Sequence, residues 1–229
     1  MKIGFFGDSF CAVHYPWVNR GPGCKTYIQK LEHNYNAEIV HLGQGGASIY
    51  DVALVQLAPF LNSGKWPDVC IFVWTGTGRL FNRTIRNMTG ANTIEYRGDD
   101  PIQNTAKSYF KYLYDQQYDY LTYNATLPYI DTTILTKIPQ TTKIINLWSF
   151  GSPINAGDFV NNITYEHRFS TGMEIRPSMM TVSVKGLLSG ESRDVKAPNH
   201  LDGDEKNERV FNWIKNAIDN YTPGGLINE

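Results

Sequence analysis

Apolar, strand-forming runs alternate with helix-forming segments along the first 74 residues, and this alternation limits the available folds most strongly. Residues 2–6 and 37–42 form short apolar runs, and residues 68–74 form a continuous one. A continuous apolar run is typical of a strand covered on both faces of a sheet. Helix-forming segments at 22–35 and 49–61 separate the three runs, and strands joined in this way pair in parallel. The sequence therefore predicts an α/β fold.

Three further elements complete the predicted domain. Residues 143–148 repeat the pattern of a buried strand, and residues 180–184 give a weaker strand signal. Residues 205–221 carry apolar side chains at helical spacing, which predicts a final helix that faces the core. We therefore expect a single domain over residues 1–229. Its predicted architecture is a three-layer α/β/α sandwich with a mostly parallel sheet of about five strands.

Two connections are longer than one crossover between strands needs. They are residues 79–142, which include a tyrosine-rich helical stretch, and residues 149–195, which are rich in Gly, Asn and Ser. Long connections of this kind either form the walls of a site or run over the surface. Both are predicted to be insertions into the α/β core.

Composition limits the partners of the chain. Its 229 residues suffice for one sizeable core, and 41% hydrophobic with 19% charged residues fits a folded globular protein. A net charge of −1 argues against nucleic acid as the partner, because phosphate binding needs excess positive charge. No apolar run approaches the length of a membrane span, and the first residues lack the pattern of a signal peptide. We therefore predict no membrane association and a cytoplasmic or virion setting. The oligomeric state is left open.

Five Asn-x-Ser/Thr triplets occur in the chain, at Asn82, Asn87, Asn124, Asn162 and Asn220. Such triplets mark glycosylation sites only in secreted proteins. In a chain rich in Asn and Thr and without a signal-peptide pattern, we interpret them as chance matches.

The tetrad Gly7-Asp8-Ser9-Phe10 places a serine directly after the first predicted strand. Parallel strands end at one common edge of a sheet, and this edge is where α/β proteins bind their ligands. The loops after residues 6, 42, 74 and 148 should therefore meet around Ser9. A serine hydroxyl is a weak nucleophile at neutral pH and needs a general base within hydrogen-bond reach. Ser9 is the candidate nucleophile, provided that a histidine reaches it.

His200 is the candidate base. It lies in the loop of residues 197–202, between Pro198 and the start of the last helix, and this loop can hold an imidazole at the sheet edge. The contexts of the other four histidines require no functional role: His14, His33, His41 and His167.

Together these segments resemble the SGNH (GDSL-type) hydrolase family. The tetrad around Ser9 resembles the first family block, and residues 42–48 (Leu-Gly-Gln-Gly-Gly-Ala-Ser) resemble the second. His200 matches the histidine of the last block. The resemblance implies a flavodoxin-like core, with Ser9 as nucleophile and the backbone N–H groups of Ser9 and Gly46 as oxyanion donors. It further implies a serine esterase that forms an acyl-enzyme. Its substrate would be a small-molecule or carbohydrate ester, such as an O-acetylated sugar, and no cofactor would be needed.

One departure from the family pattern concerns the third block, where an asparagine after a buried strand usually donates to the oxyanion. Gly78 occupies that position here and has no side-chain donor. Loss of one such donor costs roughly two to three orders of magnitude in rate. We therefore predict that Arg79, or else Thr77 or Asn82, supplies the missing hydrogen bond.

A second departure concerns the acidic member of the triad. The family places an aspartate three residues before the histidine, and that position is Ala197. Asp194, Asp202 or a backbone carbonyl would have to orient the imidazole instead. A triad is defined by geometry and roles, so these alternatives remain compatible with catalysis.

The rival hypothesis is a catalytically weakened SGNH-like module that binds a glycan or has a structural role, for example in a phage particle. Gly78 and Ala197 favour it, and Ser9 and His200 argue against it. Metal and nucleotide chemistry find little support. No Cys/His cluster has zinc spacing, residues 202–205 lack the spacing of a calcium loop, and residues 21–26 match a phosphate loop poorly. We therefore predict neither a metal site nor a cofactor site.

Overall fold

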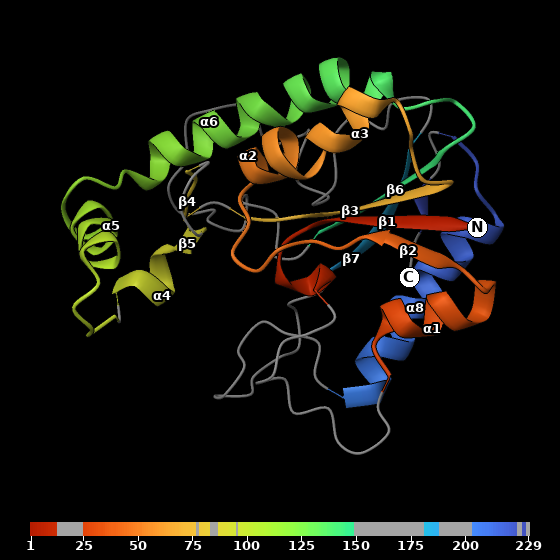
Figure 1. Cartoon of the computed structure of the whole chain (residues 1–229), viewed down its shortest axis with the longest axis horizontal. Coiled ribbons are helices and arrows are strands. Elements are labelled where there is room, and N and C mark those ends of the chain that lie inside the picture. The colour runs from red at the N-terminus through yellow and green to blue at the C-terminus, as the bar shows by residue number, and fades with distance from the viewer. Residues whose placement is uncertain are drawn as a thin grey trace.

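The protein is described by a computed structural model, which is shown as a ribbon in Figure 1. The described residues are 1–12, 25–76, 78–82, 87–94, 96–148, 181–187, 203–223 and 226–227.

A central parallel sheet organises the chain. It contains β1 (Lys2–Gly7), β2 (Glu38–His41), β3 (Val69–Trp74), β6 (Lys143–Trp148), β7 (Thr181–Leu187) and β8 (Leu226–Ile227). The strand order is β2-β1-β3-β6-β7-β8, and each neighbouring pair is parallel. The predicted α/β class with a parallel sheet is confirmed. In the described part of the chain the sheet has six strands where about five were predicted, because the two-residue β8 is too short to give a periodic signal.

The strand order contains a reversal between β1 and β3. From β1 the chain crosses to β2 on one side, and it then returns past β1 to add β3 on the other. When the strands of this sheet are numbered in chain order, β2, β1, β3, β6 and β7 follow the flavodoxin-like order 2-1-3-4-5. In such sheets the loops diverge at the reversal and leave a crevice beyond the strand ends.

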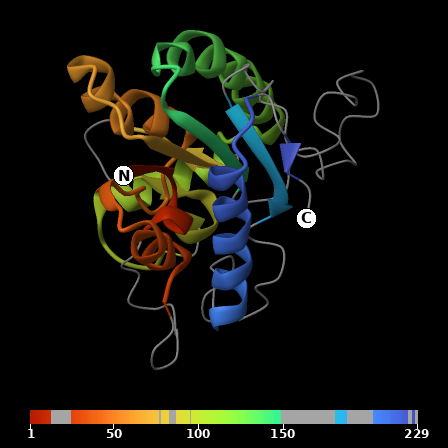
Figure 2. The ribbon, with the colours of Figure 1, turned by 90° about the vertical axis from the view of Figure 1, so that its right-hand side faces the viewer.

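One face of the sheet is covered by α1 (Tyr27–Tyr35) and α8 (Gly203–Asp219), as Figures 1 and 2 show. The predicted first helix started at residue 22, but α1 begins at Tyr27. Thr26 caps this helix, since its hydroxyl accepts from the backbone N–H of Gln29 and the Gln29 side chain accepts in return from Thr26 N. This capping box fixes the start of the helix.

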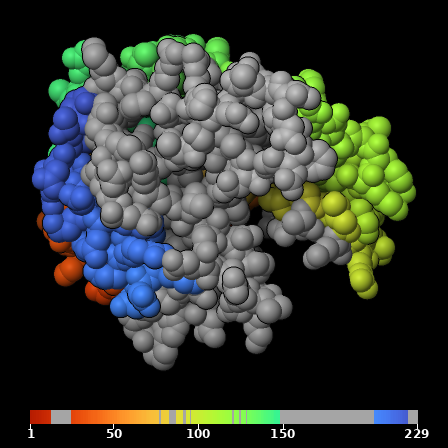
Figure 3. All heavy atoms as spheres, turned by 180° about the vertical axis from the view of Figure 1, so that it is seen from behind, coloured from red at the N-terminus to blue at the C-terminus, as the bar shows by residue number. Residues whose placement is uncertain are grey.

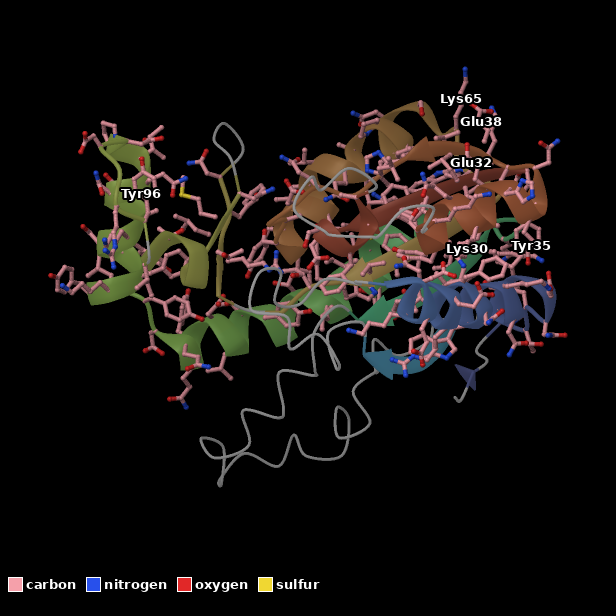
Figure 4. All side chains as sticks on the ribbon, turned by 90° about the horizontal axis from the view of Figure 1, so that it is seen from below. Lys30, Glu32, Tyr35, Glu38, Lys65 and Tyr96 are labelled. Atoms are coloured by element: carbon pink, nitrogen blue, oxygen red, sulfur yellow. The ribbon has the colours of Figure 1, made fainter. Side chains whose placement is uncertain are left out.

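Polar contacts join α1 to α8 along their length. Lys30 Nζ lies 2.8 Å from Asp204 and 2.5 Å from Glu208, and the Tyr35 hydroxyl donates to Asp219 at 2.6 Å. Figure 4 shows Lys30 and Tyr35 on the side of α1 that faces α8. These contacts fix α8 against α1.

The opposite face is covered by α2 (Ile49–Asp51), η2 (Val52–Gln56), α3 (Ala58–Ser63), α6 (Gln116–Tyr129), η3 (Ile130–Ile134) and η4 (Leu135–Lys137). Helices on both faces make three layers. The helix predicted over 49–61 is present but irregular, because η2 is a π-helical turn and the chain bends at Leu57 before α3. Pro59 explains the break, since proline lacks an N–H and clashes with the preceding helical turn.

The first predicted insertion, residues 79–142, contributes both to this layer and to a projecting part. The projecting part contains the hairpin of β4 (Arg79–Leu80) and β5 (Met88–Thr89), followed by α4 (Gly90–Ile94) and α5 (Pro101–Tyr112). In Figures 1 and 3, α4 and α5 lie at the end of the molecule away from α8. Figure 4 labels Tyr96 in this part, where its hydroxyl accepts from the backbone N–H of Asp100.

Within the described part of the chain, no helix combines the length and the apolar character needed to cross a bilayer.

Candidate active site

Ser9 lies at the reversal of the sheet. Strand β1 ends at Gly7, which pairs with Val73 of β3, and Ser9 begins the short 3-10 helix η1 (Ser9–Cys11) two residues later. Its side chain is half-buried, and no described residue forms a hydrogen bond with its hydroxyl. The serine predicted at the tip of β1 therefore lies at the switch point of the strand order, where sheets of this type bind their ligands.

Asp8 fixes the turn that carries Ser9. Its Oδ1 accepts a hydrogen bond from the backbone N–H of Phe10 at 3.1 Å, and Asp8 is the N-cap of η1. Its Oδ2 lies 3.0 Å from Nη2 of Arg79. The two oxygens of one buried carboxylate thus hold the Ser9 turn and a residue of the β4–β5 hairpin together.

Arg79 joins the loop after β1 to the loop after β2. Besides Asp8, its guanidinium contacts the backbone of Ala47, since Nη1 donates to Ala47 O at 3.0 Å. A planar guanidinium suits such a bridge because its donors point in fixed directions. The structure places Arg79 as a connection between two loops. Its predicted role as an oxyanion donor remains a prediction.

The loop after β2 approaches β1 closely. The N–H of Gln44 donates to Gly7 O at 3.0 Å, and a methyl group on Gly43 would lie only 2.6 Å from Gly7 O. Only glycine fits at Gly43 for this reason. Gly46 has φ +76°, a left-handed conformation that side chains disfavour. No described residue accepts a hydrogen bond from its N–H. The structure thus brings the Gly46 loop beside the Ser9 turn.

The buried side chain of Gln56 binds the backbone at the end of β1. Gln56 Oε1 accepts from Gly7 N at 2.9 Å, and Gln56 Nε2 donates to Gly7 O at 2.9 Å. Strand β2 pairs with β1 only as far as Gly4, so the Gln56 amide takes the place of a neighbouring peptide. Nε2 also donates to Asp51 Oδ2 at 2.7 Å, a partner five residues earlier that the π-helical turn brings into reach. No sequence pattern pointed to this contact.

The Gly78 position, where the family asparagine is missing, faces α6. The N–H of Gly78 donates to Asp119 Oδ2 at 2.6 Å, and that oxygen also accepts from the Tyr114 hydroxyl at 2.9 Å. The described backbone at this position is therefore bound to α6. Asn82, one of the alternative donors, is exposed.

Asn87 is a buried residue of the site that the sequence reasoning missed. It directly precedes β5 and is 7% exposed, and its backbone lies against Gly46. Its Oδ1 is buried without a hydrogen-bond partner. Sequence alone marked Asn87 only as part of a glycosylation triplet, because it stands in no strand-tip motif.

The thiol nearest to Ser9 is not a competing nucleophile. Cys11 is a buried free cysteine, and burial, followed by the negative charge of Asp8, raises the pKa of its thiol well above the usual value. A protonated thiol is a poor nucleophile at neutral pH. Of Ser9 and Cys11, Ser9 is therefore the better candidate nucleophile.

The remaining predicted site residues lie outside the described residues. They are Thr77, Asp194, Ala197, His200 and Asp202. Among the described residues, no group of three or more His, Cys, Asp or Glu side chains could hold a metal ion.

Comparison with known proteins does not assign the chain to a family. No family model matches its sequence, and no curated protein is significantly similar to it.

Proposed function

We propose that this protein is a serine esterase of SGNH type that hydrolyses an ester through an acyl-enzyme on Ser9. The observation that carries the proposal is the place of Ser9: a hydroxyl without a described partner, at the reversal between β1 and β3, beside the left-handed Gly46 turn. A nucleophile is useful only where a substrate can reach it, and the reversal of the strand order is where sheets of this type bind their ligands.

In the proposed reaction, Ser9 Oγ attacks the acyl carbonyl carbon while His200 accepts the hydroxyl proton. The carbonyl oxygen becomes an oxyanion, which the N–H groups of Ser9 and Gly46 stabilise. The C–O bond to the alcohol then breaks, and His200 returns the proton to the leaving group. Water attacks the acyl-enzyme with His200 again as base, and the acid and free Ser9 are released. Asp8, Arg79 and Gln56 hold the nucleophile turn throughout.

A fluorophosphonate probe tests this proposal, because it reacts with activated serines by losing fluoride and forming an O–P bond. We expect labelling at Ser9 and hydrolysis of p-nitrophenyl acetate, both lost in Ser9→Ala and His200→Ala. The exposed residues Ser108 and His33 provide matched controls, and Ser108→Ala and His33→Ala should behave as wild type. An unlabelled wild type that also fails to turn over acetylated sugars would overturn the esterase proposal.

One observation favours glycan binding without turnover as a second candidate function. Tyr112, Tyr118 and Tyr129 of the α5–α6 region are 70%, 68% and 57% exposed, whereas Tyr123 is buried in the core. Exposed aromatic rings can stack on sugars. Binding of a glycan panel that Tyr112→Ala and Tyr118→Ala weaken, while wild type hydrolyses none of the esters tested, would support this candidate over the esterase.

A further inference from the structure

Asn87 is nine-tenths buried, and its side-chain oxygen Oδ1 has no hydrogen-bond partner among the described residues. Its exposed fraction is 7%, and its Oδ1 is fully enclosed. Buried amides are nearly always hydrogen-bonded, because an unpaired polar group loses its water without compensation. An unpaired one therefore needs a reason, and binding of a ligand is one such reason.

The β4–β5 hairpin brings Asn87 to Gly46. Its strands pair Arg79 with Thr89 and Leu80 with Met88. Asn87 is the residue directly before β5, next to this last pair. A methyl group placed on Gly46 would lie 3.2 Å from Asn87 O and 3.6 Å from Asn87 Cβ. The side chain of Asn87 thus leaves the backbone beside the turn that carries the Gly46 N–H.

The same hairpin is anchored to both loops of the site. Arg79, at its first strand, binds Asp8 at 3.0 Å and Ala47 O at 3.0 Å. Gly90, just after its second strand, donates to Gly78 O at 2.9 Å. Asn87 is therefore held on a frame that also positions the Ser9 turn. A functional group needs such support in order to act with defined geometry.

The chemistry of an amide fits the missing part of the site. Gly78 offers no side chain, and its N–H is taken by Asp119. An amide carries two N–H donors, and a half-turn of its plane exchanges oxygen and nitrogen, so Asn87 can present Nδ2 to an acceptor.

We propose that Asn87 is a catalytic residue whose Nδ2 donates a hydrogen bond to the carbonyl oxygen of the ester. This bond strengthens as the oxygen gains negative charge during attack by Ser9. The donor comes from the β4–β5 hairpin and not from the strand tip at Gly78. The inference rests on the esterase function proposed above.

The test compares Asn87→Ala and Asn87→Leu with wild type and with Asn62→Ala, an exposed asparagine used as control. We expect both Asn87 variants to lower kcat for p-nitrophenyl acetate by about 10²–10³-fold with little change in KM, as for loss of one oxyanion donor. Asn62→Ala should keep wild-type kinetics. The thermal unfolding midpoint of Asn87→Leu should not fall below that of wild type, since leucine removes an unpaired polar group at similar volume.

A thionoester substrate separates catalysis from a structural effect. Sulfur accepts hydrogen bonds weakly, so loss of a donor should slow the oxygen ester much more than the thionoester. Equal slowing of both substrates, or unchanged kcat in a folded variant, overturns the role of Asn87 and leaves the esterase function standing. A wild type without Ser9 labelling or turnover overturns both.

Discussion

Asp8 Oδ2 lies 3.0 Å from Nη2 of Arg79, and neither side chain is accessible, with exposed fractions of 0% and 7%. The other oxygen of Asp8 caps the helix that begins with Ser9, and the other nitrogen of Arg79 binds the loop that contains Gly46. One ion pair therefore fixes the relative position of the proposed nucleophile and the proposed backbone oxyanion donor.

Replacing Arg79 should destabilise the fold as well as the site. Arg79→Met leaves the carboxylate of Asp8 buried without its cation, and removal of one partner of a buried pair costs about 3–5 kcal/mol. We expect a loss of that size in the free energy of unfolding, measured by urea denaturation. A loss below about 1 kcal/mol would show that Asp8 is compensated elsewhere.

Arg79→Lys separates the two roles considered for Arg79. Lysine keeps the charge for Asp8 but lacks the second nitrogen that reaches Ala47. If Arg79 acts by joining the loops, the variant should retain most of the stability and lower kcat. Unchanged kcat in a folded Arg79→Ala protein would remove the predicted oxyanion role.

The Gln56 amide should be essential for the geometry of β1. Gln56→Glu replaces its N–H donors by a carboxylate oxygen that faces Gly7 O and Asp51 Oδ2. Loss of these buried hydrogen bonds and the new repulsion should lower the free energy of unfolding by about 2–4 kcal/mol at pH 7. Thermal unfolding of the variant beside wild type measures the effect, and an unchanged midpoint would contradict the proposed clamp.

Two left-handed glycines form a matched pair for testing the Gly46 turn. Gly46 (φ +76°) lies against Asn87, while Gly64 (φ +66°) has no atom within 4 Å of a methyl group placed on it. Alanine at either position carries a backbone penalty of about 1–2 kcal/mol. Gly64→Ala should show only this loss of stability and full esterase activity. Gly46→Ala should also displace Asn87 or the Gly46 N–H, and lose activity by at least tenfold.

If Gly46→Ala and Gly64→Ala are equally active when the same fraction of each protein is folded, Gly46 is not part of the oxyanion site.

His41 should make stability depend on pH. Burial of the imidazole, which stacks on Phe6, lowers its pKa below the usual 6.5 and outweighs the opposite effects of Gln56 and Asp51. The unfolded chain therefore binds a proton at higher pH than the folded protein does. Stability is unaffected above the unfolded pKa and falls as pH drops below it.

Comparison with His41→Phe isolates this contribution. Between pH 7 and pH 5, wild type should lose more free energy of unfolding than the variant, which has no group to protonate there. Parallel stability curves for the two proteins would assign the pH dependence to other residues.

Much of the fold could be predicted because burial on both faces leaves a clear pattern. The strand at 68–74 and the strand at 143–148 were located within one residue of β3 and β6. The helix predicted over 49–61 is present, but its π-helical turn and its bend at Leu57 were not predicted, because apolar spacing does not distinguish a π-helical turn from an α-helical one. Pro59 was a visible signal for the break. The predicted start of α1 was wrong because the capping box of Thr26 and Gln29 begins the helix at Tyr27.

The candidate site divides in the same way. Ser9 could be predicted since a serine after a buried strand is readable along the chain, and the strand order alone then decides that this tip lies at the reversal of the sheet. Asn87 and Gln56 could not be predicted. Asn87 lies against Gly46, 41 residues away in the chain, and Gln56 binds Gly7, 49 residues away.

The sequence by itself determined the parallel α/β core and the serine at the end of its first strand, because hydrophobic periodicity and strand-tip motifs are local. Only the tertiary structure decided what surrounds that serine. The contacts of Arg79 with Asp8, of Gln56 with Gly7 and of Asn87 with Gly46 join distant segments. Contacts of this kind depend on how elements pack in three dimensions, which no local pattern in a single sequence encodes.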